Sequence, residues 1–151
     1  MLDEDTLKVF QLYTVWLYNG SIERADSSMK TWDPLSQAYI MGERFMDPAF
    51  QATILAAMIH RLNAGRKPDI HTVNDIYCGT SDPSPARRLM IDICLWMNRD
   101  CLRHVENPAD ELHEDLVRDL LKALLAVPVS LKSGAPWTVD PSKYFKLFDR
   151  G

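Results

Sequence analysis

Apolar residues recur every three or four positions along most of this chain, which is the spacing of one face of an α-helix. Proline marks where several of these stretches begin, because proline at the first helical position loses no hydrogen bond and a preceding Asp, Ser or Asn can cap the helix. The five pairs of this kind are Asp33-Pro34, Asp47-Pro48, Ser84-Pro85, Asn107-Pro108 and Asp140-Pro141. The pattern predicts helices over residues 4–18, 34–45, 48–63, 70–78, 85–104, 108–126 and 141–148.

Strand signals are weak by comparison. Residues 126–131 alternate between apolar and small positions but include Pro128, which restricts them to a short edge piece at most. The polar segment 21–32 predicts a loop. We therefore predict an all-α fold, a compact helical array of six to seven helices in a single domain. Its expected parts are a helical portion over 1–64, a helical extension over 65–126, and a loop with a short helix over 127–151.

The first predicted helix is apolar nearly all the way round, in the stretch "VFQLYTVWLYNGSI". A surface helix normally carries one apolar stripe and a polar back. We therefore expect this helix to be covered, either by helices 34–63 and the leucine-rich helix of the same chain or by a partner. The residues expected in the core are Phe10, Trp16, Leu17, Tyr18, Tyr39, Phe45 and Trp96.

Composition narrows the class of protein. The 151 residues are 46% hydrophobic and 25% charged, which is typical of a globular chain with a sizeable core. A net charge of −4 does not favour a nucleic-acid surface. Apolar runs are too short for a membrane span, the N-terminus is acidic rather than signal-like, and three cysteines do not suit a disulfide framework. We expect an intracellular location, in the cytoplasm or nucleus.

A metal site is the first chemical alternative. Cys94, Cys101 and His104 could share one face of the helix predicted over 85–104, and His113 could supply the fourth ligand of a tetrahedral zinc. Structural zinc sites, however, usually contain cysteine pairs two to four residues apart, and the sequence has none. We expect no metal and no cofactor, and we keep a metal-binding or enzymatic protein that uses Cys94, Cys101 and His104 as the alternative.

Catalytic signals are equally sparse. Cys78 follows His71 by seven residues, so two helical turns would separate a thiol and its base by about 10 Å. The sequence has no nucleophile elbow, phosphate-binding loop or glycine-rich dinucleotide turn. We predict that the chain is not an enzyme and has no catalytic residues.

Two adjacent arginines lie in an unusual place. Arg87 and Arg88 fall in the first turn of a predicted helix, where the helix dipole disfavours cations. We therefore expect them to pair with acidic side chains of the same chain or to point to solvent. A role in facing a partner is the alternative.

The segment "DTLKVFQLYTVWLYNGSI" resembles the central helix and following turn of a BTB/POZ domain. The segment "DPLSQAYIMGERFMDPAFQATILAAMIHRL" is similar to the helix pair that follows in that family. Its matching residues are Leu35, Tyr39, Gly42, Glu43, Arg44 and Phe45.

A third segment, "VNDIYCGTSDPSPARRLMIDICLWMNR", is similar to the helical extension of filamentous-fungal BTB proteins. Its matching residues are Tyr77, Thr80, Ser84, Pro85, Arg87, Arg88, Leu89 and Asp92. The resemblance covers residues 4 to about 100 and leaves the N-terminal half of the family's domain without a counterpart. The dimerisation and ubiquitin-ligase contacts of that half therefore transfer to no residue of this sequence.

Together these features predict a non-catalytic protein–protein interaction module, an adaptor or regulatory scaffold that resembles the helical half of a BTB/POZ domain with a C-terminal helical extension. The expected partners are proteins, including other copies in a homo-oligomer, with no nucleic acid and no membrane. A structural helical subunit of a larger assembly is a further alternative.

Overall fold

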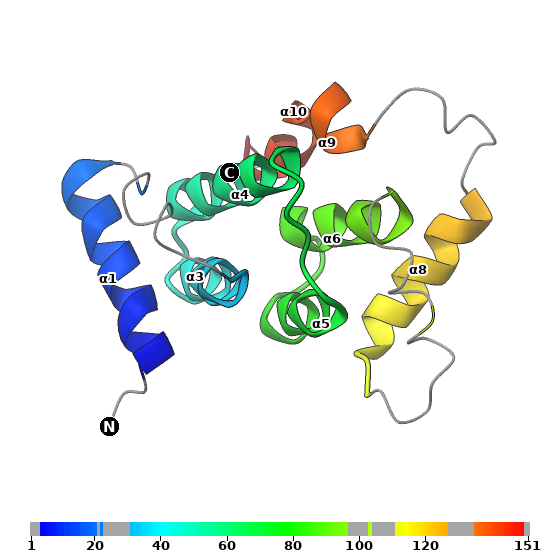
Figure 1. Cartoon of the computed structure of the whole chain (residues 1–151), viewed down its shortest axis with the longest axis horizontal. Coiled ribbons are helices and arrows are strands. Elements are labelled where there is room, and N and C mark those ends of the chain that lie inside the picture. The colour runs from blue at the N-terminus through cyan, green and yellow to red at the C-terminus, as the bar shows by residue number, and fades with distance from the viewer. Residues whose placement is uncertain are drawn as a thin grey trace. The chain divides into compact units, whose positions relative to one another are not determined.

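The computed structural model describes residues 4–20, 22, 31–96, 103, 111–126 and 135–149. Every regular element with described bounds is helical, which confirms the all-α prediction (Figure 1). The elements are α1 (Glu4–Asn19), α3 (Asp33–Arg44), α4 (Pro48–Asn63), α5 (Ile70–Gly79), α6 (Pro85–Trp96), α8 (Glu114–Ala126), α9 (Pro136–Val139), α10 (Ser142–Phe145) and the 3-10 helix η1 (Lys146–Asp149).

The chain divides into two compact units, Met1–Ala64 and Gly65–Gly151. We call them unit 1 and unit 2. The division falls at the boundary that the sequence suggested between the helical portion and its extension. Whether the two units form the single domain expected from the sequence stays a prediction.

Several helix starts follow the predicted capping rule. Asp47 Oδ1 accepts a hydrogen bond of 3.1 Å from the Phe50 N–H at the start of α4. Ser84 Oγ accepts one of 3.4 Å from the Arg87 N–H at the start of α6. Asp33 and Asp140 are exceptions, because no side chain caps α3, which begins at Asp33 itself after Trp32, or α10, which begins at Ser142 after Pro141. In α3 the backbone bonding starts earlier, with the Ser36 N–H donating to the Trp32 carbonyl at 3.0 Å.

The helix predicted over 108–126 begins later than expected, at Glu114. Asn74 of α5 holds the preceding residues out of the helix. Its Oδ1 accepts from the His113 N–H at 2.7 Å, and its Nδ2 donates to the Glu111 carbonyl at 3.5 Å. His113 Nδ1 then accepts from the Asp115 N–H at 3.1 Å and caps α8. The prediction was therefore wrong for residues 111–113.

Other boundary predictions have mixed outcomes. α1 ends where the Asn19-Gly20 signal placed it, with Gly20 at a φ of 70°. The helix predicted over 141–148 divides into α10 and η1, and α9 is a short helix that the sequence pattern did not predict. The predictions for 97–102, 104–110 and 127–131 lie outside the described residues.

Unit 1 is built on α3 and α4, which are joined by a short turn, with α1 packed against α3 (Figure 1). Gly42 allows α3 and α4 to approach closely. A Cβ at that position would lie 2.8 Å from Gln51 Cγ and 3.1 Å from Phe50 Cδ2. The fully buried side chains of this unit include Leu12, Leu35, Tyr39, Phe50, Ile54, Leu55 and Met58.

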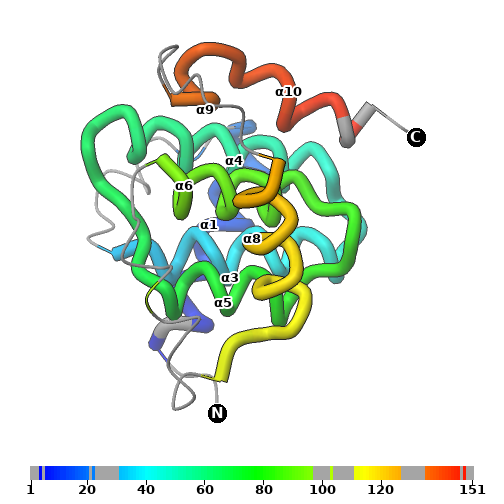
Figure 2. The backbone as a smooth tube through the Cα atoms, turned by 90° about the vertical axis from the view of Figure 1, so that its right-hand side faces the viewer, coloured from blue at the N-terminus to red at the C-terminus, as the bar shows by residue number. Residues whose placement is uncertain are grey.

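Unit 2 is built on α5 and α6, and Figure 2 shows α8 lying across them. α10 packs against α6, where Tyr144 is fully buried and its hydroxyl donates to Asp92 Oδ2 at 2.6 Å. Lys143 Nζ lies 3.0 Å from the same carboxylate oxygen. The remaining core comes from apolar faces of the three longer helices, with Val73, Ile76, Tyr77, Leu89, Met90, Leu116 and Leu120 buried.

The predicted core is only partly right. Tyr39 is buried, as expected, and Trp16 and Trp96 are half-buried. The burial prediction is wrong for the four other residues, because α1 packs through one face only and the α3–α4 turn is open to solvent. These exposed residues are Phe10, Leu17, Tyr18 and Phe45.

Candidate interaction surface

The inner face of α1 fixes how the helix sits on the rest of unit 1. Val9 and Leu12 are buried on this face. Trp16 Nε1 donates to Thr53 Oγ1 at 3.1 Å, and the Tyr13 hydroxyl donates to Asp47 Oδ2 at 3.1 Å. Both bonds join α1 to α4 or to its capping residue. They therefore set the rotation of α1 about its own axis and decide which residues face outward.

Aromatic rings fill the space beside this face. The Tyr13 ring meets Phe50 edge-on at 4.8 Å between centroids, lies 5.4 Å from Phe45, and stacks with Trp16 at 6.1 Å. Such ring pairs add to the stabilisation gained from buried area. Burial and the Asp47 hydrogen bond raise the pKa of Tyr13, so its hydroxyl remains a protonated donor. The cluster connects α1 to the α3–α4 turn.

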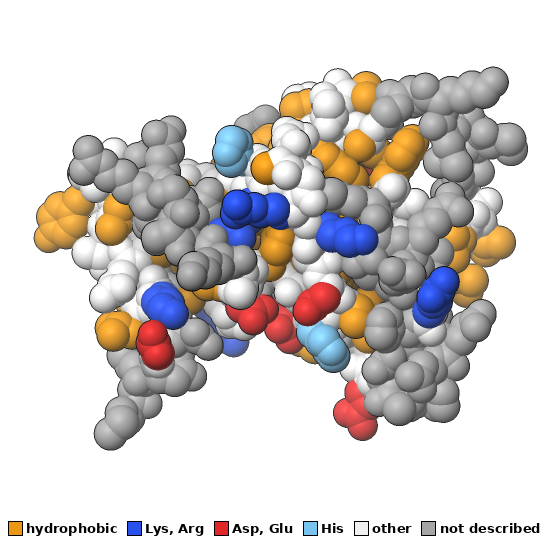
Figure 3. All heavy atoms as spheres, viewed as in Figure 1, with side chains coloured by type: hydrophobic (Ala, Val, Ile, Leu, Met, Phe, Trp, Pro, Cys, Tyr) orange, Lys and Arg blue, Asp and Glu red, His pale blue; other side chains and the backbone are white. Residues whose placement is uncertain are grey.

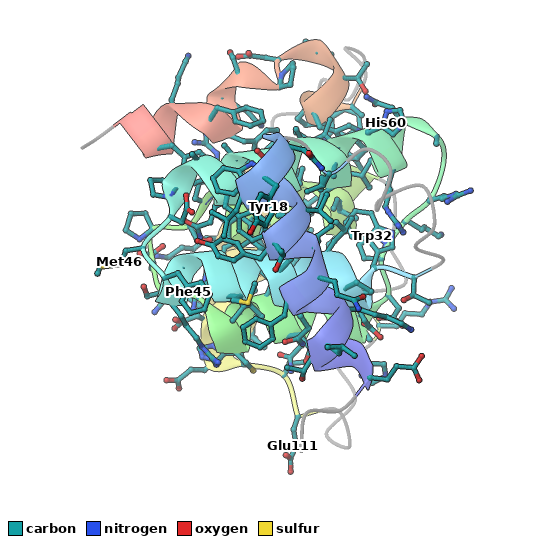
Figure 4. All side chains as sticks on the ribbon, turned by 90° about the vertical axis from the view of Figure 1, so that its left-hand side faces the viewer. Tyr18, Trp32, Phe45, Met46, His60 and Glu111 are labelled. Carbon is teal, nitrogen blue, oxygen red and sulfur yellow. The ribbon has the colours of Figure 1, made fainter. Side chains whose placement is uncertain are left out.

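The outer face of α1 is apolar and exposed. Together with the exposed end of the cluster at the α3–α4 turn, it forms a surface that we call the α1 patch. Figure 4 shows Tyr18 on α1, with Phe45 and Met46 at the turn beside it, and hydrophobic side chains reach the surface over α1 in Figure 3. The α1 patch consists of Leu7 (47% exposed), Phe10 (40%), Leu17 (58%), Tyr18 (85%), Phe45 (48%) and Met46 (86%).

The α1 patch carries no charge among these six side chains. The nearest described charges on α1 are Glu4 and Lys8, which form an i,i+4 pair at 3.4 Å. Thr14 also lies on the outer face, and its hydroxyl donates to the Phe10 carbonyl at 2.8 Å. Because that bond satisfies the hydroxyl within the helix, Thr14 presents mainly its methyl group to the outside.

A second set of exposed apolar side chains lies on α8. Leu121, Leu124 and Leu125 are exposed, while Leu116 and Leu120 of the same helix are buried in unit 2. These three side chains are aliphatic and include no aromatic ring. They provide a matched comparison for the α1 patch.

Arg87 has no outward role. Its side chain is buried, and Nη1 forms an ion pair with Asp115 Oδ2 at 3.0 Å. Nε donates to Thr80 Oγ1 at 3.0 Å, and Nη2 donates to the carbonyls of Tyr77, at 2.8 Å, and Thr80. The alternative in which Arg87 faces a partner is therefore wrong, and the expected acidic partner is Asp115. Arg88 is exposed, so its outward role stays a prediction.

The Arg87 contacts belong to a polar network that joins α8 to α5 and α6. The Tyr77 hydroxyl donates to Asp119 Oδ2 at 2.8 Å, and the Arg87 guanidinium lies 4.6 Å from the centroid of the Tyr77 ring. Burial, followed by the Asp119 hydrogen bond, raises the pKa of Tyr77. The hydrogen bond from Arg87 lowers the pKa of Asp115. Only Leu116 and Leu120 of the leucine-rich helix α8 are buried, and this network fixes its position against α5 and α6.

The metal and enzyme alternative stays untested, because two of its three residues lie outside the described part of the chain. Cys94 is fully buried, His113 caps α8, and Cys101 and His104 lie outside the described residues. Within the described ranges, no three His, Cys, Asp or Glu side chains gather in a way that could hold a metal ion. Cys78 and His71 lie near opposite ends of α5, as the seven-residue spacing predicted.

Among the described residues, no helix combines the length and apolar character needed to cross a membrane. No protein-family model, curated protein or solved structure matches the chain.

Proposed function

We propose that this chain is a non-catalytic protein–protein interaction module and that the α1 patch is its docking face. The observation that carries the proposal is a helix with one face packed into unit 1 and an opposite apolar face exposed. Neighbouring exposed apolar side chains on a folded protein are typical of interaction sites. Aromatic residues and methionine, here Phe10, Tyr18, Phe45 and Met46, are enriched at the centres of such interfaces.

We propose further that the chain is related to BTB/POZ proteins of the filamentous-fungal type. Its role would be that of an adaptor or regulatory scaffold in the cytoplasm or nucleus. One point of support is the order of elements in unit 1. Among the described elements, a helix that ends at Asn19, just before Gly20, precedes the α3–α4 pair, which is the order that the resemblance implies. The exposed position of Arg88 leaves it available as a secondary contact.

The test is a binding experiment with matched surface variants. We would use the purified full chain as bait in an extract of the cells that express it and quantify the captured proteins by mass spectrometry. The variant Leu17→Ser/Tyr18→Ser alters the α1 patch, whereas Leu124→Ser/Leu125→Ser removes equally exposed side chains from α8. We expect only the first pair to abolish capture of specific proteins.

Folding must be checked in the same samples. Both double variants change exposed side chains, so their thermal unfolding midpoints should stay close to that of the parent chain. Equal capture by the parent and the α1 variant would contradict the proposal. Stoichiometric metal in the purified chain, with a chelator-induced fall in the unfolding midpoint, would replace it with the Cys94, Cys101 and His104 alternative.

A further inference from the structure

The outer face of α1 has the spacing of a coiled-coil seam. Leu7, Phe10, Thr14 and Leu17 follow one another at intervals of three, four and three residues, which are the a and d positions of a heptad. The side chains of Val9 and Leu12, which pack into unit 1, lie on the opposite side of the helix. The packing of unit 1 thus leaves a second, regular seam facing outward.

Nothing on this seam requires a polar partner. The Thr14 hydroxyl already bonds to the Phe10 carbonyl at 2.8 Å, so the only polar residue in the a and d positions is satisfied within α1. Leu7, Phe10 and Leu17 are between 40% and 58% exposed, which leaves apolar surface for a second helix to cover. A helix packed on this seam would gain the transfer free energy of that surface.

Glu4 is the one charged residue at the positions of α1 beside the seam, and it pairs with Lys8 of the same helix at 3.4 Å. In heptad terms Glu4, Gln11 and Tyr18 occupy e positions, and Thr6 and Tyr13 occupy g positions. Charges at e and g normally set the choice of partner in coiled coils. In an antiparallel pair, Glu4 of each copy would lie near the uncharged Tyr18 of the other. A second copy of the same helix therefore meets no like-charge repulsion at these positions, which allows self-pairing.

The charge distribution along α1 favours an antiparallel arrangement. Glu4 lies in the first turn of α1. A parallel pair would place the two Glu4 side chains at the same end, whereas an antiparallel pair sets each one near the C-terminal end of the other helix. Opposed helix dipoles favour the same orientation.

Two-fold symmetry would bring further apolar residues into the contact between the two copies. In an antiparallel pair the two-fold axis runs across the helices, so residues on one side of the seam meet the same side of the other copy. Phe45 contacts Tyr13, a g position, at 5.4 Å between ring centroids, which places the α3–α4 turn on the g side. Phe45 and Met46 of both copies would therefore meet there and widen the apolar contact.

We propose that the occupant of the α1 patch is a second copy of this chain, with the two α1 helices packed antiparallel. Leu7 of each copy then faces Leu17 of the other, Phe10 faces Thr14, and the two Gln11 side chains lie opposite each other near the two-fold axis. This inference rests on the proposed function and names its partner. The seam from Leu7 to Leu17 is only about 15 Å long, so we expect a weak dimer with a Kd on the order of 10 μM or above.

The test uses the pair of Gln11 side chains as a probe of both contact and direction. Sedimentation equilibrium of the full chain over a concentration series should show a monomer–dimer equilibrium. Gln11→Glu and Gln11→Lys should each raise the Kd about twofold to fivefold through like-charge repulsion. An equimolar mixture of the two variants should restore or exceed the parent affinity, and Leu17→Glu should raise the Kd more than tenfold.

The matched control is Gln37, an exposed glutamine on α3 of the same unit. Gln37→Glu and Gln37→Lys should leave the Kd unchanged. A chain that stays monomeric at every concentration would overturn the second copy as occupant, while the capture experiment above could still succeed with another protein. A dimer that ignores the Gln11 charges, or that responds equally at Gln37, would overturn the antiparallel α1 pairing.

Discussion

The buried side chain of Arg87 bonds to three residues of unit 2, Tyr77, Thr80 and Asp115. Replacing it with methionine keeps the approximate length but leaves Asp115 without its buried partner and two carbonyls without donors. Breaking a buried ion pair from one side typically costs about 3–5 kcal/mol. We expect Arg87→Met to lower the free energy of unfolding by an amount in that range, measured by urea denaturation.

Its neighbour Arg88 is the matched control for this experiment. The Arg88 side chain is exposed, and surface substitutions usually change stability by less than about 0.5 kcal/mol. Arg88→Met should therefore leave the unfolding midpoint nearly unchanged. A similar loss in both variants would show that charge in the first turn of α6, rather than the Arg87 contacts, determines the effect.

Asp115 gives the same contact a pH dependence. The hydrogen bond from Arg87 lowers its pKa in the folded chain below the ordinary value of 3.8. The unfolded chain therefore takes up this proton first, so the stabilisation is complete above about pH 4 and is lost as the pH falls through the lower folded-state pKa. We expect the free energy of unfolding to fall less steeply below pH 4 in Asp115→Asn than in the parent, by urea titrations at several pH values.

At the scale of elements, the α3–α4 crossing depends on one missing side chain. Gly→Ala inside a helix normally stabilises it by up to about 1 kcal/mol. At Gly42 the new Cβ would lie 2.8 Å from Gln51 Cγ and 3.1 Å from the Phe50 ring, so we expect Gly42→Ala instead to destabilise unit 1 by about 1–3 kcal/mol. Adding Gln51→Ala should recover part of that loss in thermal unfolding, because it removes the closer atom. A stabilised Gly42→Ala variant would contradict the close approach.

Helix positions were predictable from the sequence where local chemistry decided them. Asp47 and Ser84 cap helices whose starts were predicted from the proline that follows each of them. The start of α8 was not predictable in this way, because Asn74, far away in the sequence, binds the backbone of residues 111–113. A local pattern contains no information about such a contact. The short α9 shows the same limit, since only its Pro136 marks it.

At the scale of the whole molecule, the sequence identified α1 as a helix with too much apolar surface but could not say which side would be covered. Packing decided that, through the Trp16–Thr53 and Tyr13–Asp47 bonds. The interval pattern at Leu7, Phe10, Thr14 and Leu17 was present in the sequence, yet an apolar helix contains several such patterns. Only the buried inner face shows which one remains outside. The α1 patch could therefore be identified only from the structure, whereas the helix itself could be predicted from the sequence.

Two compact units raise the question of whether the chain unfolds in one step or two. Phe50 is fully buried in unit 1 and Met90 in unit 2, and truncating either to alanine should cost about 2–5 kcal/mol. Because each unit has its own core, we expect Phe50→Ala to reduce hydrogen-exchange protection in α4 but not in α6, and Met90→Ala to do the reverse. If instead either variant lowers protection in both helices equally, the two units unfold together, as the single domain predicted from the sequence would. The measurement thus tests whether the two units unfold independently of each other.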